Sequence, residues 1–481
     1  MIIKGKQCDY KVVIGLETHA ELNTVTKLFS QSKNEFASPQ NSNVCLFDIA
    51  TPGLLPVFNE GVLNKAVAFG LAVNADINKV SRFDRKHYFY PDLPQGYQIT
   101  QFYEPIIRNG KLDIKNNEGV IKTIRIHEAH IEQDAGKLIH DRDVEHSYVD
   151  YNRAGVPLIE IVTEPDFEDP DEVVTYLKSL QAILRSINAS LADLEKGTFR
   201  CDANVSVMPV GSSKLGTRCE IKNINSFRFV AQAIKYEANR QVKLIDNGEK
   251  VIQQTRLFNP KTETTEVMRD KADAVDYRYF PDPDLLPIIL TDDYIDEIRK
   301  NLPELPMQKA ERYKKLGLPQ KENDFLVQNT EYANYFDTLI KKHDVKLSST
   351  WMLTELFGRL GKLQKTLSEC SVNAEKLIGL MDNIENNTIS GKIAKDVLDD
   401  MLLTNKTADE IIKEKNLKQI DDVDTITKFV NEVIIENEKQ VEEYKSGNNK
   451  LFGFFVGQTL KKMGGKANPA TVNKIVKEKL G

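Results

Sequence analysis

A single carboxylate inside an otherwise apolar segment is the feature that most restricts how this chain can fold. Glu160 lies in the middle of the run LIEIV, residues 158–162. The run is too short for an independent helix and rich in β-branched residues, so it predicts a buried strand. Burying a carboxylate costs several kcal/mol unless a cation, a metal ion or a proton offsets it. Glu160 therefore indicates either a metal site on a rigid strand or a structural ion pair, for which Arg153 is available.

The composition is that of an ordinary globular protein. The chain has 481 residues, of which 41% are hydrophobic and 28% charged, and its net charge of −6 neither favours nor excludes a nucleic-acid partner. None of the five cysteines forms a CxxC pair, so neither a zinc ribbon nor a disulfide framework is indicated. No apolar run is long enough to span a bilayer, and the N-terminus lacks the apolar segment of a signal peptide. We therefore expect a cytoplasmic protein that does not bind a membrane.

The spacing of apolar residues predicts an α+β fold in three parts. For residues 1–292 we predict a domain with a mostly antiparallel sheet, in which two helices interrupt the strands. One helix starts at the cap residue Asp169, and the other runs from Ser226 to about Asp246. Residues 293–404 show helical spacing with Gly and Pro at segment ends, which predicts an all-α domain. The predicted strands are 11–22, 148–151, 158–162, 199–207 and 219–222.

Residues 405–481 predict a small helical tail that is divided by charge. Acidic residues outnumber lysines in 408–444, whereas lysines dominate 445–481. The Gly and Asn residues of SGNNKLFGFFVGQTLKKMGGKANP leave backbone N–H groups free near helix N-termini, which suits phosphate binding. A solvated positive face on a small helical module is the alternative interpretation.

Acidic and imidazole side chains alternate along several predicted strands. In VVIGLETHAEL, strand alternation puts Glu17, His19 and Glu21 on one face, where they could bind a divalent ion. For any single strand, a solvent-facing edge is the alternative interpretation. The same alternation groups Glu128, His130 and Glu132, then Asp202, Asn204 and Ser206, and finally Glu220 and Lys222.

Taken together, these strands predict a site for a hard metal ion. They offer many oxygen ligands and few cysteines, which favours Mg²⁺, in one or more sites, over zinc. Mg²⁺ held by carboxylates is typical of enzymes that act on nucleotide phosphates. The zinc-helix motif HExxH is absent, and so are the phosphate-binding motifs GxxxxGK[ST] and GxGxxG.

Two loops combine basic and aromatic residues. Such loops can clamp phosphates or stack on bases, and their aromatic rings can also pack the loops onto the sheet. The first loop holds Arg82, Arg85, Lys86, His87, Tyr88, Tyr90 and Tyr97, and the second holds Arg269, Lys271, Arg278 and Tyr279.

Seven segments of the chain resemble the B subunit of the aminoacyl-tRNA amidotransferase, the GatB family. They are long, occur in order and are rich in unusual residues, and the resemblance extends from about residue 10 to the C-terminus. The segments are VIGLETHAELNTVTKLFS, FDRKHYFYPDLPQGYQITQ, HIEQDAGK, NRAGVPLIEIVTEPD, GTFRCDANVSV, EIKNINSF and YRYFPDPDLLP.

The resemblance implies an α+β cradle domain, a helical domain and a small helical tail, and a two-step reaction on a misacylated tRNA. Glutamate on tRNA(Gln), or aspartate on tRNA(Asn), is phosphorylated by ATP at its side-chain carboxylate, and ammonia then displaces the phosphate to give the amide. The ammonia comes from glutamine hydrolysed by a separate amidase-family glutaminase subunit, and a small third subunit helps to join the two. This chain would supply the kinase and transamidase site and most of the tRNA binding.

The resemblance also implies roles for individual residues. Mg²⁺ would shield the repulsion between ATP and the substrate carboxylate and stabilise the transferring phosphoryl group. Glu160 is expected to be essential for catalysis, and we add three cationic residues as contacts to phosphate or substrate. The expected metal ligands are Glu17, His19, Glu132 and Glu160, with Asp202 and Glu220 for a second ion, and the expected cationic contacts are Lys86, Arg200 and Lys222.

The chain departs from many relatives in residues 27–53. Some members carry two pairs of Cys there that form a zinc site, whereas only Cys45 remains here. We therefore expect no zinc, and we expect packing to replace it. Cys201 and Cys219 fall on the apolar faces of their strands, so we assign no glutaminase nucleophile to this chain.

Two hypotheses from different classes follow. The first is the ATP-dependent enzyme, and the second is a non-catalytic tRNA-binding scaffold subunit in which the acidic residues are structural. The two hypotheses differ most sharply at Glu160. A metal-dependent hydrolase of small phosphates is a third possibility, but it would leave the basic tail without a purpose.

Overall fold

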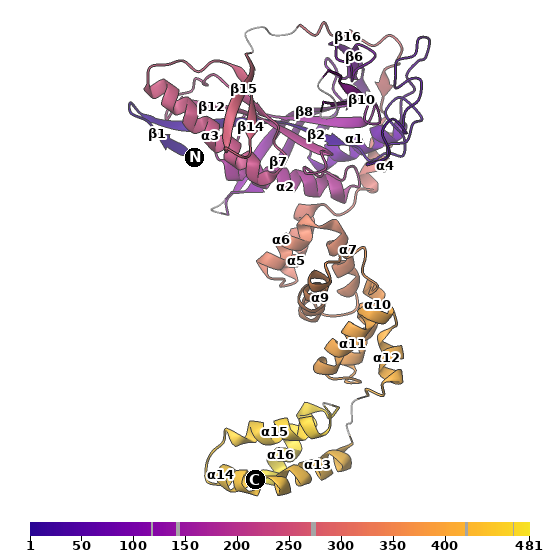
Figure 1. The fold of residues 1–481 in the computed structure, drawn as a ribbon, viewed down its shortest axis with the longest axis vertical. Coiled ribbons are helices and arrows are strands. Elements are labelled where there is room, and N and C mark those ends of the chain that lie inside the picture. Colours follow the sequence, from indigo (N-terminus) through magenta and orange to yellow (C-terminus); the bar gives the residue numbers. More distant parts are fainter. Residues whose placement is uncertain (117–118, 141–144, 271–275, 419–421, 465) are drawn as a thin grey trace. The chain divides into compact units, whose positions relative to one another are not determined.

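The computed structural model describes residues 1–116, 119–140, 145–270, 276–418, 422–464 and 466–481. These residues form two compact units, Met1–Lys309 and Ala310–Gly481. The first unit is built around sheets, and the described elements of the second are all helices (Figure 1), which confirms the α+β class. The division at residues 292 and 404 stays a prediction. Among the described residues, every helix is too short or too polar to cross a lipid bilayer.

A ten-stranded sheet organises the first unit. Its strands follow the order β15-β14-β13-β12-β2-β11-β8-β7-β3, with β1 paired to β2 off this path. Among the described pairs of this sheet, β13–β14 is parallel and the others are antiparallel. The strands are β1 Ile2–Lys4, β2 Asp9–Glu21, β3 Asp76–Ile77, β7 Ile107–Lys115, β8 Ile121–Gln133, β11 Pro157–Thr163, β12 Phe199–Pro209, β13 Cys219–Lys222, β14 Gln254–Asn259 and β15 Thr264–Asp270.

Helices cover one face of this sheet, and the polar residues lie on the other. The alternating residues Val12, Ile14 and Leu16 of β2 are buried in one core that also contains apolar residues of α1, α2 and α3. Glu17 and His19 therefore project from the face opposite the helices. Figure 1 shows α2 and α3 lying across the sheet. The helices of this unit are α1 Glu60–Ala72, α2 Pro170–Ser186, α3 Phe227–Asp246, α4 Asp292–Lys300 and α5 Pro306–Lys315, whose last residues lie beyond Lys309.

The helices α2 and α3 begin at their predicted caps, but the prediction of only two helices was incomplete. The side chains of Asp169 and Ser226 accept hydrogen bonds from backbone N–H groups of the first turns, as expected. The missed helix α1 is apolar on nearly every side, so it lacks the polar stripe that marks a helix in sequence. It also contains Gly70, which reads as a breaker although a side chain there would collide with Ile77 and Ile107.

Smaller sheets build the surroundings of the polar face. The strands β16, β5 and β6 form a three-stranded sheet, and Gln98 of β6 donates to the backbone carbonyl of Gln133 in β8 at 2.7 Å. This contact places the small sheet beside the end of β8. Two further pairs are β9–β10 and β4–β17. The bounds are β4 Val80–Ser81, β5 Asp84–His87, β6 Tyr97–Thr100, β9 Lys137–Ile139, β10 Tyr148–Asp150, β16 Phe280–Pro281 and β17 Ile288–Ile289.

The second unit contains two separate hydrophobic clusters, one within Tyr313–Ile412 and one within Ile426–Leu480. The helix α12 packs Ile411 and Ile412 into the first of these clusters. The helices are α6 Gln320–Gln328, α7 Thr330–Leu339, α8 Val345–Ser349, the π-helix η1 Thr350–Leu356, α9 Phe357–Leu363, α10 Ala374–Glu385, α11 Gly391–Thr404, α12 Ala408–Glu414, α13 Val423–Glu436, α14 Glu438–Lys445, α15 Leu451–Lys462 and α16 Pro469–Leu480.

Candidate metal and phosphate site

Strand register aligns the polar residues of four neighbouring strands into a row. Glu160 of β11 lies opposite His19 of β2 and opposite His130 of β8, and His19 in turn lies opposite Arg200 of β12. Paired residues of adjacent strands project from the same face, so these four side chains share the face opposite the helices. Residues far apart in the sequence thus meet because of the register alone.

Glu160 is surrounded by imidazoles. Its Oε2 atom lies 3.2 Å from Nε2 of His19 and 3.3 Å from Nε2 of His130. Glu132 lies against the same two rings, at 3.4 Å from His19 and 3.8 Å from His130. Arg153 pairs with Asp134 at 3.4 Å, so the alternative in which Arg153 neutralises Glu160 is wrong.

The charges of this cluster depend on one another. Burial alone raises the pKa of Glu160, but His130 and His19 outweigh burial and hold that pKa well below its ordinary value. Burial and Glu160 raise the pKa of Glu132, yet hydrogen bonds from the two imidazoles bring it to about 2. Burial lowers the pKa of His130, but Glu160 and Glu132 outweigh it and raise the pKa to about 10. The two carboxylates therefore stay ionised and require positive charge beside them.

The donor atoms lie close enough to converge on one cation. Ligand atoms of Glu17, His19 and Glu160 all lie within 4.8 Å of one another, and so do those of His130, Glu132 and Glu160. Carboxylate oxygens suit Mg²⁺ and Mn²⁺, and imidazole nitrogens also suit Mn²⁺ and Zn²⁺. The donor set thus fits a divalent cation. The buried Nδ1 atom of His130 has no hydrogen-bond partner among the described residues.

His130 belongs to this cluster, although it was not predicted as a ligand. Strand alternation had placed it on the same face as Glu132, and that alternation was the available signal. What the sequence lacked was the register that sets His130 opposite Glu160. Glu128, the third member of the predicted face, lies opposite Val162 and outside the two groups of close ligand atoms.

A second group of charges surrounds Lys222. Its Nζ atom lies 2.5 Å from Asp202 and 3.4 Å from Glu220, and Thr255 donates to Glu220 at 2.8 Å. Asp202 is the register partner of Glu17, so this group borders the first one. Among the described residues, neither Asp202 nor Glu220 belongs to a group of three close ligand atoms. Both carboxylates instead lie against the Lys222 ammonium. Their role at a second ion stays a prediction.

Burial affects Glu17 differently from its neighbours. Burial first and Glu160 second raise the pKa of Glu17 to about 7, against the opposing effects of His19 and Lys222. The carboxyl group of Glu17 is therefore the member of the cluster whose charge changes near neutral pH. A cation bound beside it would favour the ionised form.

The remaining predicted cations lie at the edges of the cluster. Burial lowers the pKa of Lys86, but Glu132, Tyr279 and Glu160 outweigh burial and raise it, so the ammonium is charged at neutral pH. The guanidinium of Arg200 pairs with Asp134 at 2.7 Å. Arg200 thus lies on the polar face in line with His19, and Lys86 of β5 lies near enough to Glu132 and Glu160 for their charges to affect it.

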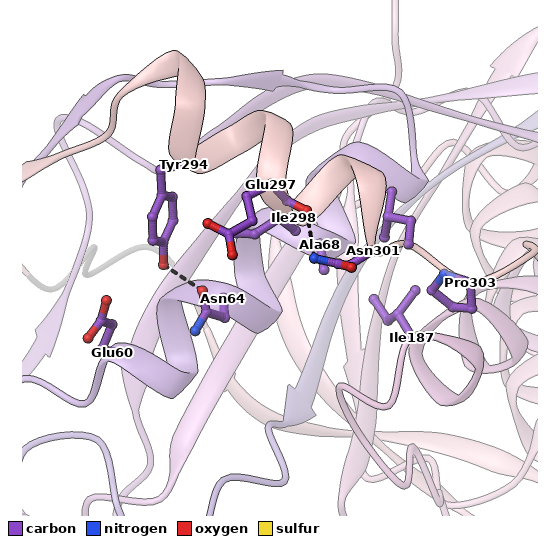
Figure 2. A pocket seen from close by; sticks show the side chains of 10 residues that line it. Glu60, Asn64, Ala68, Ile187, Tyr294, Glu297, Ile298, Asn301 and Pro303 are labelled. Carbon is purple, nitrogen blue, oxygen red and sulfur yellow. Dashed lines mark hydrogen bonds between the residues drawn. The ribbon is translucent and has the colours of Figure 1, made fainter.

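Among its described residues, the first unit contains two cavities. One is lined by none of the predicted site residues, and the other is lined by Glu21 and Arg153. Figure 2 shows a cavity of about 540 Å³ between α1 and α4, where the Tyr294 hydroxyl donates to Asn64 at 2.6 Å. None of the predicted site residues lines it. A second cavity of about 440 Å³ is lined by Glu21 and Arg153 among others. Burial first and Asp134 second raise the pKa of Glu21 to about 7.

The stretch that could have held zinc is instead organised around Asp48. This buried carboxylate accepts hydrogen bonds from Lys27 at 3.2 Å, Ser30 at 2.8 Å and Ser32 at 2.6 Å, and from the backbone N–H of Cys45 at 3.0 Å. Lys27 is itself fully buried. A network of hydrogen bonds and one buried ion pair thus connects the two ends of this stretch.

Comparison with known proteins assigns the chain to a family. Residues 12–296 match the GatB/GatE catalytic domain, and residues 334–480 match the GatB domain. The chain is 51% identical over 480 residues to the B subunit of the aspartyl/glutamyl-tRNA(Asn/Gln) amidotransferase of Rickettsia bellii, with 100% of this chain and 99% of that protein covered. It is 53% identical over 481 residues to the protein of the same name from Ehrlichia chaffeensis, with the same coverage.

These matches define a sheet-based catalytic domain followed by a helical region of the GatB type. The chain belongs to the GatB family, and the resemblance inferred from its sequence motifs is confirmed.

Proposed function

We propose that this protein is the amidotransferase subunit that converts Glu-tRNA(Gln), Asp-tRNA(Asn) or both into Gln-tRNA(Gln) and Asn-tRNA(Asn). The observation that supports the proposal most strongly is the meeting of Glu17, His19, Glu132 and Glu160 on one face of one sheet. Named relatives that are about half identical over their full length support the same activity.

The proposed reaction has two steps. A side-chain carboxylate oxygen of the tRNA-linked amino acid attacks the γ-phosphorus of ATP, and ADP leaves. Ammonia then attacks the acyl carbon, phosphate leaves, and the surplus proton of the nitrogen passes to solvent. The first step is needed because an unmodified carboxylate oxygen is a poor leaving group.

We propose that the cluster holds Mg²⁺ through Glu17, His19, Glu132 and Glu160, with His130 as a further donor. When bound, the ion would neutralise phosphate charge and stabilise the transferring phosphoryl group. The residues themselves orient the ion because each belongs to a strand of a hydrogen-bonded sheet. A second ion at Asp202 and Glu220 would require the Lys222 ammonium to move from between them.

The cations Lys86, Arg200 and Lys222 are proposed to hold phosphate oxygens or the substrate carboxylate. Burial lowers the pKa of Lys222, but Asp202 and Glu220 outweigh burial and raise it, so Lys222 remains charged at neutral pH. A fixed positive charge beside the reacting oxygens costs no reorganisation during the reaction. These three residues would therefore position the nucleotide and the carboxylate against each other.

The wider assembly is proposed on the same basis. An amidase-family glutaminase subunit would supply ammonia, and a small third subunit would help to join it to this chain. Residues 1–292 would form the cradle domain, residues 293–404 the helical domain, and residues 405–481 the tail that contacts the misacylated tRNA. We place the assembly in the cytoplasm and expect no zinc in residues 27–53.

The substitution Glu160→Gln tests the proposal. In the assembled complex it should abolish ATP-dependent amidation of misacylated tRNA, while tRNA binding and glutamine hydrolysis by the partner continue. Glu128→Gln is the matched control because it lies on the same face of β8 but outside the groups of close ligand atoms. If the Glu160→Gln complex still amidates at the rate of the Glu128→Gln complex, the non-catalytic scaffold becomes the better explanation.

A further inference from the structure

Six aromatic rings form a continuous row beside the small sheet of β16, β5 and β6. They come from three segments that are far apart in the sequence, namely the segment after β5, the segment after β6 and the segment before β16. We call this set the aromatic row. It runs Tyr90, Tyr88, Tyr277, Tyr279, Phe102 and Tyr103, with successive ring centroids 6.1, 6.1, 6.1, 4.0 and 5.1 Å apart.

Much of the aromatic row faces solvent. Tyr90 is 59% exposed, Phe102 51% and Tyr103 53%, and the neighbouring Phe89 is 83% exposed. Aromatic side chains normally contribute to stability by being buried, so exposed rings at both ends of one continuous row indicate a binding surface. The rings nearest the centre of the row, Tyr277 and Tyr279, are half-buried.

Two cations that form no salt bridge with the described residues accompany the row. Lys86 Nζ lies 5.1 Å from the centroid of Tyr277, and Arg278 lies between Tyr277 and Tyr279 in the sequence. No carboxylate oxygen of the described residues lies within salt-bridge distance of either side chain. By contrast, Arg85 of β5 pairs with Asp282 and Asp284, which follow β16 in the sequence. Lys86 and Arg278 are therefore available to an anionic ligand. The side chain of Arg269 and the whole of Lys271, also predicted here, lie outside the described residues.

The aromatic row adjoins the metal and phosphate site. The Thr100 hydroxyl donates to Glu132 at 3.4 Å, and Phe102 follows Thr100 by two residues. The backbones of Thr100 and Phe102 are thus within about 7 Å of each other. A ligand that lies on the row has one end next to the carboxylate cluster.

We propose that the aromatic row stacks the unpaired nucleotides at the 3′ end of the aminoacyl-tRNA, with Arg278 on their phosphates. The inference rests on the proposed function, because the amino acid is esterified to the terminal ribose. The last nucleotides must then lie next to the reacting carboxylate. Several exposed rings suit a run of unpaired bases, each of which stacks on an aromatic side chain. The single adenine of ATP would use only one of them.

The test uses the full-length protein and an acceptor-stem minihelix whose terminal adenine is replaced by 2-aminopurine. Stacking on an aromatic ring quenches the fluorescence of this base. Phe102→Leu should weaken minihelix binding by about 5- to 150-fold and remove the quenching. Phe102→Tyr should retain both, because it keeps an aromatic face. Phe36→Leu is the matched control, since Phe36 is 56% exposed and lies outside the row.

Two further probes make the result specific. A minihelix that lacks its unpaired nucleotides should bind the wild-type protein and Phe102→Leu equally. The affinity for ATP should be the same in all four proteins. Tyr103→Leu provides a second variant at the exposed end of the row, and thermal melting checks that each variant is folded.

The proposal is overturned if Phe102→Leu and Tyr103→Leu bind and quench the intact minihelix as the wild type does. It is also overturned if these variants lose affinity for ATP but not for the minihelix, because the row would then be a site for the adenine of ATP. An active wild-type complex that gives no quenching would contradict this inference and leave the proposed function standing. If the complex quenches the fluorescence but its Glu160→Gln variant still amidates normally, this inference stands and the proposed function is contradicted.

Discussion

Glu160 lies directly opposite His19 in the β2–β11 register, and its Oε2 atom lies 3.2 Å from the imidazole Nε2 atom. The hydrogen bonds that pair β2 with β11 hold the two strands together. The same register also fixes the two side chains next to each other. The carboxylate is held by the sheet itself, without a loop to position it.

Binding of a divalent cation should become tighter as pH rises. A proton on His130, whose pKa is raised to about 10, competes with the cation for a ring nitrogen. A proton on Glu17, whose pKa is raised to about 7, competes with the cation for a carboxylate oxygen. Each displaced proton contributes up to about one unit of log affinity per pH unit below the pKa. Titration calorimetry with Mn²⁺ between pH 6 and 9, in buffers of different ionisation enthalpy, measures both affinity and proton release.

His130→Gln should lower the affinity for Mn²⁺ and reduce the number of protons released. His140→Gln is the control, because His140 lies outside the ligand groups and its ring contacts Ser147. Equal affinities and equal proton release for both variants would exclude His130 from the metal site.

Asp48→Asn should destabilise the first unit by about 3–5 kcal/mol, because it leaves the Lys27 ammonium buried without its anion. The loss should be visible as faster proteolysis within residues 27–53 and as a lower midpoint of thermal unfolding. Glu35→Gln, an exposed acid of the same stretch, should change neither. The double variant Lys27→Met with Asp48→Leu should recover much of the stability, and no recovery would show that the pair is not the cause.

Glu237→Gln should destabilise the protein at neutral pH and flatten its acid sensitivity. Glu237 is fully buried and accepts hydrogen bonds from Arg240 at 2.6 Å, Gln241 at 2.9 Å and Thr265 at 2.9 Å. Burial raises its pKa, but these partners outweigh burial and lower the pKa below its ordinary 4.5. The stabilisation is therefore present above pH 4.5 and is lost as pH falls through the lower pKa of the folded state.

Urea unfolding at pH 7 and at pH 4 measures this effect. The wild-type free energy of unfolding should fall more between the two pH values than that of Glu237→Gln. Glu249→Gln, which removes an exposed carboxylate three residues after α3, should behave like the wild type. Parallel pH profiles for all three proteins would contradict the assignment.

Removal of residues 405–481 should weaken tRNA binding and make it less dependent on salt, because the lysines of the tail release counterions when they contact phosphates. Since α12 packs into the preceding hydrophobic cluster, a cut after residue 418 tests the tail with less disturbance. Replacing Lys474, Lys477 and Lys479 of α16 with Gln should reduce the salt slope by about 0.7–0.9 for each phosphate that the tail no longer neutralises. An unchanged slope would remove the tail from the binding surface.

Much of the fold could be predicted from the sequence because it is encoded locally. Alternation in β2 is a local property, and so are the caps Asp169 and Ser226, and each was predicted correctly. The helix α1 was missed because it is buried on nearly every side, which removes the pattern that marks a surface helix.

The site was predictable face by face, but its pairings were not. Alternation placed Glu160, His19 and His130 on strand faces, but only the register between distant strands shows which residues meet. Arg153, close in the sequence, was the cation available for the alternative in which Glu160 forms a structural ion pair, yet it pairs with Asp134. Register depends on hydrogen bonds between segments that are 30 residues apart for His130 and Glu160 and 141 apart for His19 and Glu160, and local sequence carries no information about it.

The alternation of β11 has a consequence for how the protein can vary. Its residues Ile159 and Ile161 enter the apolar core while Glu160 points the other way, so a single-residue insertion or deletion within the strand would exchange these roles. A carboxylate would be driven among the helices, and isoleucines would replace it among the imidazoles. Folding and chemistry would be lost in one event, so we expect length changes to be tolerated only in the loops that flank this strand.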